Sequence, residues 1–512
     1  MTYRFTRILL TCLVVLICYT SAKSSQSVCP DDLRKTLKLT ILYMNDPHAH
    51  YSPESKKDES GFTGGFAKAQ SVIEQIRKAN ASEGRHTIFL LAGDLLTGTS
   101  YSTVFRGSMG VELLNAMSLT AMVVGNHEFD YGIDNLTKNL RPRMNFPLLS
   151  ANILDDHGHL LFQKSTMMSF ENNLNSVIIF GLTTPQTPVM SSPKNVSHLT
   201  FEDPVLSANK ELSEIAPNCL VVALTHLGLK MDKLLAASSP GINVIIGGHS
   251  HTRVETPIKV GGTIICQAGA YAEFLGRLDV DFRDGKILSY TGKLIPLETT
   301  VSEDERIRSL IEKYKESMSP ELERTLGYNE AQLDASRRDV RSDAPNKLAI
   351  LIAGLVADSV GADLGLVNSG SIRAGMEKGK VTLNDIYKIL PFDDTVVKLQ
   401  INGADLEAVL QTSAQLPDGS GGKLQSYGIV TRRVGDSIEL LKVKGRPFEA
   451  SENYSIAVGE FLASGGDGYE ILRYKGKNKL DSGLVIRDLL VHFVETKQTV
   501  TEKDVPAVSA NW

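Results

Sequence analysis

Short apolar runs alternate with helical patterns through the N-terminal half of the chain. Residues 66–76 show a helical pattern, because apolar side chains recur there every three or four positions. The continuous apolar runs, each of a length typical of buried strands, cover residues 37–44, 87–92, 121–124, 220–224 and 242–246. This alternation predicts an α/β domain whose strands are buried on both faces.

The C-terminal half repeats the α/β pattern after a charged, glycine-free stretch between Pro296 and Glu323. Such a stretch favours a helix and is typical of a linker between domains. Expected strands cover residues 364–367, 396–401 and 454–458, and expected helices cover 346–357, 383–390 and 403–412. The boundaries we expect are a signal peptide at 1–22, a first domain at 36–300, a linker helix at 301–325, a second domain at 326–495 and a polar tail at 496–512.

The N-terminus has the pattern of a secretory signal peptide. Arg4 and Arg7 precede an apolar run at residues 8–19, and small residues follow at 20–22. The run is short for a membrane span, although a retained anchor helix is the alternative interpretation. Residues 491–512 are charged and lack the apolar tail of a lipid-anchor signal. We therefore expect a secreted protein without a membrane anchor.

Composition narrows the class of protein. The chain has 512 residues, of which 42% are hydrophobic and 22% charged, as in ordinary globular proteins. A length of this order is too great for one compact core, in agreement with two domains. The net charge of −5 argues against a nucleic-acid binder, which needs a basic face. An enzyme acting on small molecules is the interpretation that remains.

Metal-type ligands follow five of the expected strands, often next to glycine. A single histidine at such a position is more often a structural or surface residue. Ligand sites in α/β sheets lie at the carboxyl ends of strands, so side chains placed there converge on one cleft. The chain has 11 histidines, and the ones in these motifs are His48, His50, His127, His226, His249 and His251.

The donors in these motifs indicate a site for two divalent metal ions. They are carboxylates, an amide and imidazoles, without thiolates: Asp46, His48, Asp94, Asn126, His226 and His249. This mixture suits Zn²⁺ or Mn²⁺, and less closely Mg²⁺ or Ca²⁺. Two ions about 3.5–4 Å apart can activate a water and bind the oxygens of a phosphoryl group. A purely structural metal site would need only four ligands, fewer than the motifs provide.

The motifs resemble those of the calcineurin-like metallophosphoesterases, in the 5′-nucleotidase branch that includes ecto-5′-nucleotidases and secreted apyrases of blood-feeding arthropods. The resemblance covers nearly all of the chain beyond the signal peptide. It implies a four-layer α/β/β/α metallophosphoesterase domain, a linker helix and an α/β nucleotide-binding domain. The strings that carry it are Asn45-Asp46-Pro47-His48, Gly93-Asp94, Gly125-Asn126-His127-Glu128-Phe129-Asp130, Thr225-His226 and Gly247-Gly248-His249-Ser250-His251.

The resemblance also implies roles for single residues. One metal would be held by Asp46, His48 and Asp94, with His251 as a further ligand. The other would be held by Asp94, Asn126, His226 and His249. His50 falls at a position that varies in the family and has no assigned role.

His127 and Asp130 are not needed as ligands. Their spacing after a strand allows Asp130 to orient the imidazole and keep it protonated, so that its charge would stabilise the transition state of phosphoryl transfer. The family implies the same catalytic role for this pair. The alternative is a helix-capping aspartate beside a buried histidine.

The C-terminal half resembles the nucleotide-binding domain of the same family. Two arginines would bind phosphate oxygens, an aromatic ring would stack on the base, and an aspartate would accept hydrogen bonds from the ribose hydroxyls. Read without the motifs, each arginine could equally be a surface residue and the phenylalanine a core residue. The substrate-binding residues that the resemblance implies are Arg341, Asn346, Asn368, Arg373, Phe461 and Asp467.

Two positions depart from the family pattern. Many members stack the base between two aromatic rings, but Lys423 stands where the second ring is expected. Tyr427 is close enough in sequence to replace it, and a lysine beside the pocket would favour substrates with more phosphate charge. The second departure is at residues 346–349, where the usual Gly-Asn after the helix start is missing.

We therefore expect a secreted, dinuclear-metal nucleotide phosphohydrolase with ATP, ADP or AMP as substrate. The first expectation is an apyrase that converts ATP and ADP to AMP, which in saliva would inhibit platelet aggregation. The alternatives are a soluble 5′-nucleotidase that converts AMP to adenosine, and a non-catalytic secreted protein that binds nucleotides or a receptor.

Secretion would also make two kinds of covalent modification relevant. Cys29, Cys219 and Cys266 remain after signal-peptide removal, which allows one disulfide. The sequence does not show which of them pair. The Asn-X-Ser/Thr sequences available for glycosylation begin at Asn80, Asn135, Asn195 and Asn453.

Overall fold

The structure is a computed structural model that describes residues 36–55, 62–170, 175–191, 193–318, 320–333, 341, 344–434 and 437–506. The expected signal peptide at 1–22, Cys29 and residues 507–512 of the expected tail lie outside these ranges. Within them, no helix is both long enough and apolar enough to cross a membrane.

The N-terminal domain is built on two six-stranded sheets. The first has the order β16 (Lys286–Pro296), β15 (Phe274–Arg283), β1 (Leu37–Met44), β4 (His86–Leu91), β5 (Ala121–Val123) and β6 (Leu148–Leu149). The second has the order β13 (Ile258–Val260), β14 (Thr263–Cys266), β12 (Val244–Ile246), β11 (Leu220–His226), β9 (Asn175–Thr183) and β8 (Ser165–Phe170).

The two sheets pack face to face because their strands are apolar on both sides. Side chains of a strand alternate between its faces, so Leu39 and Ile41 of β1 enter the core between the sheets. Leu42 and Met44 of the same strand belong instead to a core on the outer face. The strand is therefore the doubly buried run that the sequence predicts.

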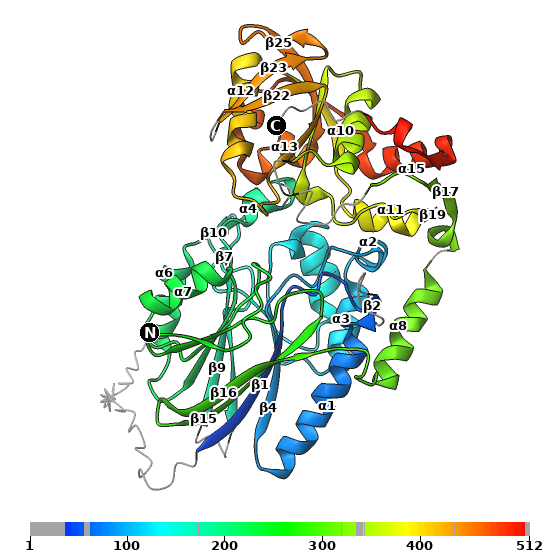
Figure 1. The fold of residues 1–512 in the computed structure, drawn as a ribbon. Helices are drawn as coiled ribbons and strands as arrows, with labels where there is room; N and C mark the ends of the chain where they lie inside the picture. The colour runs from blue at the N-terminus through cyan, green and yellow to red at the C-terminus, as the bar shows by residue number, and fades with distance from the viewer. Residues whose placement is uncertain are drawn as a thin grey trace, which may run out of the picture.

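Helices cover both outer faces and complete a four-layer α/β/β/α domain, as expected (Figure 1). On the first sheet lie α1 (Phe66–Ser82), α3 (Ser108–Ala116) and α8 (Glu305–Ser317). On the second lie α6 (Pro204–Glu214) and α7 (Leu229–Ser238). The helix α8 falls inside the expected linker, and Ile307 and Ile311 anchor it to the core of the N-terminal domain.

The C-terminal domain contains a five-stranded sheet with the order β21 (Leu424–Tyr427), β18 (Leu364–Asn368), β25 (Asn453–Gly459), β20 (Thr395–Asn402) and β26 (Lys477–Val485). Apolar clusters lie on both faces of this sheet. One includes residues of α10 (Lys347–Ser359) and α15 (Ile486–Lys497), and the other includes α12 (Gly403–Gln415) and a hairpin of β22 (Ile429–Val434) and β23 (Ser437–Val443).

Residues 496–504 are packed against the C-terminal domain, whereas the sequence suggests a polar tail there. The strand β27 (Thr499–Val500) pairs in parallel with β17 (Thr325–Asn329). Val500 is fully buried, because this single apolar residue within a charged stretch points into the core. The short helix η8 (Glu502–Asp504) follows.

The remaining elements are short and lie mainly in connections. The helical ones are α2 (Ser100–Phe105), η2 (His127–Phe129), η3 (Asn135–Leu140), η4 (Arg141–Arg143), α4 (Thr187–Met190), α5 (Pro193–Val196), η5 (Pro320–Glu323), η6 (Ser369–Ser371), α11 (Leu383–Ile389), α13 (Glu460–Ala463), η7 (Gly466–Gly468) and α14 (Glu470–Lys475). The strands are β2 (Glu54–Ser55), β3 (Phe62–Thr63), β7 (Ile153–Leu154), β10 (Thr200–Phe201), β19 (Gly379–Thr382) and β24 (Arg446–Pro447).

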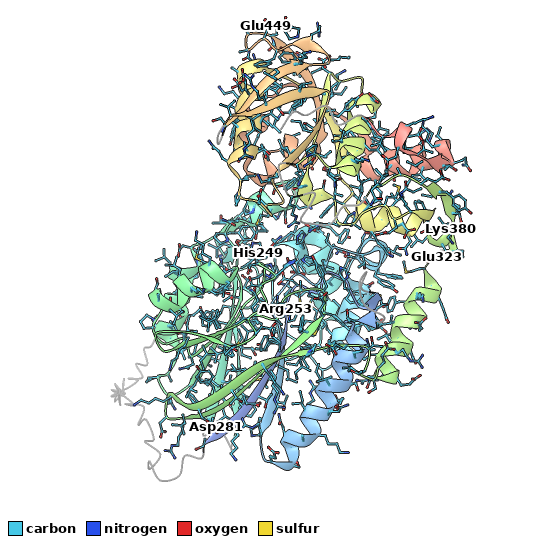
Figure 2. All side chains as sticks on the ribbon, in the orientation of Figure 1. His249, Arg253, Asp281, Glu323, Lys380 and Glu449 are labelled. Carbon is cyan, nitrogen blue, oxygen red and sulfur yellow. The ribbon has the colours of Figure 1, made fainter. Side chains whose placement is uncertain are left out.

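The two domains meet at the carboxyl ends of the parallel strands. The helix α4 contacts η7, and α2 contacts α11 across this boundary (Figure 1). His249 lies near the boundary in Figure 2, whereas Asp281 and Glu449 lie at opposite ends of the molecule. The strand ends of the first domain therefore face the second domain.

The close packing within the first sheet predicts a strong effect of one added methyl group. Gly276 of β15 lies beneath the ring of Tyr43, and a Cβ at this position would come within 2.1 Å of the ring carbons. We expect Gly276→Ala to destabilise the protein by about 1–3 kcal/mol, measured as a lower thermal unfolding midpoint. Gly262→Ala is the matched control, because no neighbouring atom lies within 4 Å of the added Cβ. Equal midpoints for both variants would contradict the packing argument.

Candidate active site

The expected metal ligands lie together at the ends of strands from both sheets. Asp46 follows β1, Asp94 follows β4 and Asn126 follows β5, which are neighbouring parallel strands of the first sheet. His226 ends β11 and His249 follows β12, which are neighbours in the second sheet. The sandwich thus brings ligands to one place from segments that are up to 203 residues apart.

Asp46, His48 and His251 form the first cluster. The Nε2 atoms of His48 and His251 lie 3.1 Å apart, and His251 Nε2 is 3.4 Å from Asp46 Oδ1. Two nitrogens bound to one tetrahedral ion at about 2.0–2.1 Å are separated by about 3.3 Å. The spacing of these donor atoms therefore fits a shared cation.

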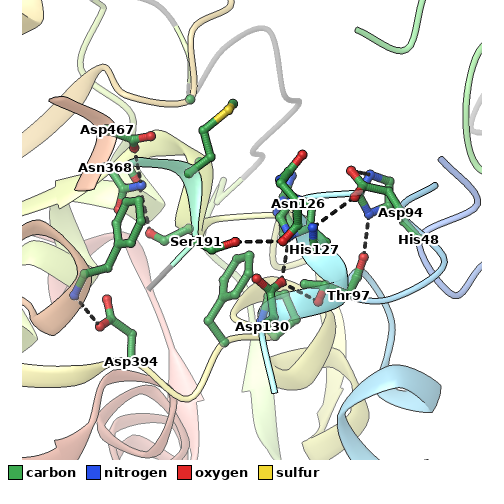
Figure 3. Close-up of a pocket in the computed structure, with 18 of the residues that line it drawn as sticks. His48, Asp94, Thr97, Asn126, His127, Asp130, Ser191, Asn368, Asp394 and Asp467 are labelled. Atoms are coloured by element: carbon green, nitrogen blue, oxygen red, sulfur yellow. Dashed lines mark hydrogen bonds and ion pairs between the residues drawn. The ribbon is translucent and has the colours of Figure 1, made fainter. Parts of the chain in front are cut away.

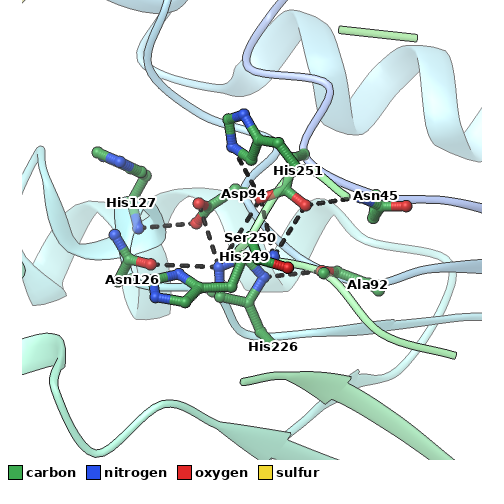
Figure 4. A network of polar contacts seen from close by, with 12 residues as sticks. Asn45, Ala92, Asp94, Asn126, His127, His226, His249, Ser250 and His251 are labelled. Atoms are coloured by element: carbon green, nitrogen blue, oxygen red, sulfur yellow. Dashed lines mark hydrogen bonds and ion pairs between the residues drawn. The ribbon is translucent and has the colours of Figure 1, made fainter. Parts of the chain in front are cut away.

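Asp94, Asn126, His226 and His249 form the second cluster (Figure 4). His226 Nε2 lies 3.1 Å from Asp94 Oδ2 and 3.2 Å from Asn126 Oδ1. The same Oδ2 atom of Asp94 is 3.8 Å from Nε2 of His48 in the first cluster. Asp94 is thus placed between the two clusters, as a bridging carboxylate must be.

Backbone carbonyls orient two of the imidazoles. His48 Nδ1 lies 2.7 Å from the carbonyl of Thr97, and His226 Nδ1 lies 2.8 Å from the carbonyl of Ala92. A ring nitrogen that donates to a carbonyl leaves the other nitrogen unprotonated and available as a ligand. Both Nε2 atoms therefore face the clusters, where each can bind a metal once its ring is neutral.

The charges of the clusters also favour a cation. Asp46 and Asp94 are almost fully buried carboxylates, which is costly without a positive partner. Burial lowers the pKa of His226, but the carboxylate of Asp94 outweighs this effect and raises the pKa to about 10. Burial lowers the pKa of His249 to about 4, so this imidazole is neutral and able to bind a metal. The donor set therefore fits divalent ions.

The ligand loops are held in a strained backbone conformation. Positive φ values between 46° and 74° occur at Asp46, His48, Asp94, His249 and His251. Each costs about 1–2 kcal/mol for a residue with a Cβ. Such conformations persist only where the surrounding structure enforces them, and they cluster at functional sites.

Three buried polar residues without an assigned role enforce this geometry. The Glu128 carboxylate accepts hydrogen bonds from the backbone N–H groups of Asp94 (3.0 Å) and Gly125 (2.6 Å), and so joins two ligand loops. Gln267 accepts from the N–H of Thr252 and donates to the carbonyl of Gly248, on either side of His249 and His251. The side chain of Asn45 donates a hydrogen bond to Oδ2 of Asp46 and so holds that carboxylate.

His127 and Asp130 lie in the predicted arrangement. His127 Nδ1 is 2.6 Å from Asp130 Oδ2, which also accepts a hydrogen bond from Thr97 (2.6 Å). Burial opposes protonation, but the carboxylates of Asp130 and Asp94 raise the pKa of His127 above its ordinary value. The imidazole therefore has the orientation that the sequence suggests, and its surroundings favour the protonated form. His50, which has no assigned role, lies against Tyr271 with ring centroids 4.5 Å apart.

A cavity of about 720 Å³ joins this site to the C-terminal domain (Figure 3). His48, Asp94, Asn126, His127, His249 and His251 line it from the first domain. Arg341, Asn368, Arg373, Phe461 and Asp467 line it from the second. Arg373 Nη2 lies 3.4 Å from His127 Nε2, so the expected phosphate-binding and catalytic residues meet in one place.

The structure places Asn346 outside the residues that line the cavity. Its side chain caps α10 by accepting from the N–H of Ala349, and its own N–H donates to Gln425. The sequence resemblance suggests a substrate contact here, but the side chain serves to start a helix.

Lys423 and Tyr427 are likewise absent from the lining among the described residues. Lys423 is 1% exposed, and its Nζ lies 3.5 Å from Asp418. Tyr427 packs on Gly354 of α10. Neither side chain provides the second stacking surface, and the idea that Lys423 lies beside the substrate phosphates is not supported by this position.

The expected modification sites differ in accessibility. Asn80 is buried and donates to Thr40 and Thr87, and Asn195 lines the cavity and donates to the carbonyl of Asp130. Asn135 is also buried. Asn453 is exposed, so it is the position among these where a glycan fits the folded chain. Among the described residues, Cys219 and Cys266 form no disulfide, and Cys29 lies outside them.

A four-layer domain with clustered imidazoles and carboxylates at its strand ends defines a metallophosphoesterase. The calcineurin-like phosphoesterase family matches residues 39–253, and the C-terminal domain family of the 5′-nucleotidases matches residues 325–474. The chain belongs to the 5′-nucleotidase family, and it is a nucleotide-hydrolysing enzyme. Its fold and His/Asp clusters indicate divalent metal ions.

Individual relatives match along most of their length. The human 5′-nucleotidase is 30% identical over 85% of this chain and 84% of its own. The 5′-nucleotidase of Vibrio vulnificus is 28% identical over 91% of each chain. The crystal structure of a 5′-nucleotidase precursor from Thermus thermophilus has a TM-score of 0.80 at 26% identity, covering 92% of this chain and 98% of that one.

The position of Glu128 predicts that it maintains the metal site without binding a metal. Glu128→Gln places an amide N–H against backbone N–H donors, which costs about 1–3 kcal/mol for each unsatisfied group. We expect lower bound-metal content, measured by mass spectrometry, and a lower unfolding midpoint. Glu83→Gln, on the exposed end of α1, is the matched control. Unchanged metal content in Glu128→Gln would show that the loops hold their geometry without this carboxylate.

Proposed function

We propose that the protein hydrolyses nucleoside 5′-phosphates. The first candidate substrate is a nucleoside monophosphate such as AMP. The observation that carries this proposal is the single cavity lined by both the metal-type ligands and the expected nucleotide-binding residues. The relatives named 5′-nucleotidase, at 28–30% identity, support it.

The proposed metal ligands divide between two ions. One ion would be held by Asp46, His48, Asp94 and His251, and the other by Asp94, Asn126, His226 and His249. When bound, such ions supply an activated water and neutralise charge on the phosphoryl oxygens.

His127 is proposed to stabilise the transition state as an imidazolium. Asp130 holds its Nδ1 proton, which directs Nε2 into the cavity beside Arg373. Charge that grows on the phosphoryl oxygens and on the leaving ester oxygen would be stabilised there. After cleavage, the same imidazolium can donate a proton to the nucleoside 5′-oxygen.

Arg341 and Arg373 are proposed to bind phosphate oxygens. Their buried Nε atoms find no hydrogen-bond partner among the described residues. Burial lowers the pKa of Arg341 to about 10, and the neighbouring guanidinium of Arg373 adds to this effect. Two neighbouring, half-buried guanidiniums whose Nε donors are unpaired among the described residues favour an anion between them.

The nucleoside is proposed to lie against Phe461 and Asp467. The ring of Phe461 packs on Gly466 and lines the cavity, where it can stack on a base. Asn368 donates to Asp467 Oδ2 at 2.8 Å, which leaves acceptor capacity of this carboxylate for ribose hydroxyls.

An apyrase activity towards ATP and ADP is the second candidate. The observation that favours it is the pair of guanidiniums in a cavity of about 720 Å³, which offers charge for more than one phosphate. Phosphate release from AMP, ADP and ATP decides between the two, measured with Mg²⁺, Mn²⁺, Zn²⁺ or Ca²⁺ and with a chelator. Consumption of AMP supports the first proposal, and accumulation of AMP from ADP supports the second. No release in any condition would contradict both.

We also propose, from the sequence pattern at residues 1–22, that the protein is exported. N-terminal sequencing of the mature protein, recovered from the medium or the periplasm, tests this. A start near residue 23 supports export, and an intact residue 1 contradicts it.

A substitution of His127 tests the catalytic role proposed for this imidazole. We expect His127→Ala to lower kcat by about 10²–10⁴-fold, because general-acid and charge-stabilising contributions are of this size. KM and bound-metal content should change little. His157→Ala, on an exposed turn, is the matched control. An unchanged kcat in His127→Ala would contradict the proposed role of this residue.

The raised pKa of Asp467 predicts that the preference of the enzyme for substrates with ribose hydroxyls depends on pH. Burial raises the pKa of this carboxyl to about 6, against the opposing effects of Asn368 and Arg341. The carboxylate is therefore an acceptor above that pH and is protonated below it. We expect the preference for AMP over 2′,3′-dideoxy-AMP, in kcat/KM, to be about 10-fold or more at pH 8 and to shrink below pH 6. Asp467→Asn should show a small preference at every pH.

The two substrates carry the same phosphate, so titration of the phosphate or of the metal ligands cancels in their ratio. A preference that stays constant from pH 5 to pH 8 would show that Asp467 does not contact the ribose.

A further inference from the structure

Phe461 is the aromatic side chain expected at the nucleoside end of the cavity. Tyr131 and Phe392 also line the cavity, but Phe392 lies at the phosphoryl end, with its ring centroid 6.2 Å from that of His127, and Tyr131 follows Asp130. Phe461 is fixed in two ways: its ring packs on Gly466, where an added Cβ would lie 2.5 Å from the ring, and its N–H donates to Asp394 at 3.0 Å (Figure 3). The family position for an opposing ring carries Lys423, whose side chain is buried away from the cavity lining. A base stacked on Phe461 therefore needs a different second wall.

The N-terminal domain supplies an apolar side chain to this region. Met190, at the end of α4, lines the same cavity as Phe461 and Asp467. The helix α4 contacts η7, the turn that contains Asp467 (Figure 1). Met190 thus belongs to a segment of the first domain that reaches the nucleoside-binding turn of the second.

This segment is also tied to the catalytic loops. Ser191, next to Met190, donates to the carbonyl of Asn126 at 2.7 Å, and Asn195 donates to the carbonyl of Asp130 at 3.1 Å. Both hydrogen bonds lie within the first domain and fix the segment relative to the expected metal and phosphoryl site. The position of Met190 is therefore set by the loops that carry the chemistry.

We propose that Met190 is a specificity-determining residue that forms the second wall of the nucleoside site, opposite Phe461. This inference rests on the proposed nucleotide hydrolysis and adds a substrate contact from the metal-binding domain. A thioether is polarisable, lacks hydrogen-bonding directionality and packs well on aromatic faces. It contacts the face of any base without reading its edge. Because the two walls belong to different domains, a bound base favours the arrangement in which the domains face each other.

The test compares AMP with ribose 5-phosphate, which has the same sugar and ester but no base. Met190→Ala should raise KM for AMP about 3- to 10-fold, the range expected for loss of a sulfur–aromatic contact and its packing. The kcat for AMP should stay within about twofold of the wild-type value. The same holds for the kinetic constants of ribose 5-phosphate, measured as a substrate or as a competitive inhibitor. Met190→Leu should restore most of the affinity for AMP, because it keeps an apolar side chain of similar size.

Two further variants complete the design. Met167→Ala, at an exposed position of β8, is the matched control and should leave all constants unchanged. In a double-mutant cycle, Met190→Ala should cost less in a Phe461→Ala background than in the wild type, because both side chains contact the same base. Bound-metal content and the unfolding midpoint verify that each variant is folded.

The outcomes separate this inference from the proposed function. If the wild-type protein releases phosphate from neither compound, the proposed function fails and the inference with it. If the wild type prefers AMP but Met190→Ala keeps that preference, the inference alone is overturned. Equal losses for AMP and ribose 5-phosphate would also overturn it, since they would place the effect of Met190 on the phosphoryl site.

Discussion

The buried carboxylate of Asp94 is the interaction on which the rest of the site depends. It lies at the end of a central strand, between an imidazole from its own sheet and one from the opposite sheet. A carboxylate in this position is unfavourable without positive charge, so the surrounding groups are arranged to provide or to bind it. The strained ligand loops, the carbonyl-oriented imidazoles and the supporting carboxylate of Glu128 all serve this arrangement.

In the proposed function, the second domain gives this charged site its selectivity. Arg373 reaches His127 from the C-terminal domain, and Phe461 and Asp467 line the same cavity. A phosphoester held only by the first domain would be selected for its charge alone. As proposed, walls from both domains would select for the group that the phosphate carries, and binding of this group would favour contact between the domains.

The sequence is informative about the fold because its strands are apolar on both faces. The doubly buried run at residues 37–44 and the helical pattern at 66–76 correspond to β1 and α1. Antiparallel strands such as β15 and β22 escape prediction, because their alternating polar residues carry a weaker signal. Val500 falls in the expected polar tail for a similar reason: one apolar residue among charges shows its burial only when its partner strand is known.

For the site, the sequence by itself determined which chemical groups stand at the strand ends, since glycine, aspartate and histidine recur there in specific strings. Tertiary structure decided which of these groups meet, because the spacing between donor atoms depends on the packing of two sheets. It also separated residues that the motifs treat alike: Asn368 lines the cavity, whereas Asn346 caps a helix and Lys423 is buried with its Nζ beside Asp418. Met190 has no motif at all, and its place opposite the second domain follows only from how the two domains contact each other.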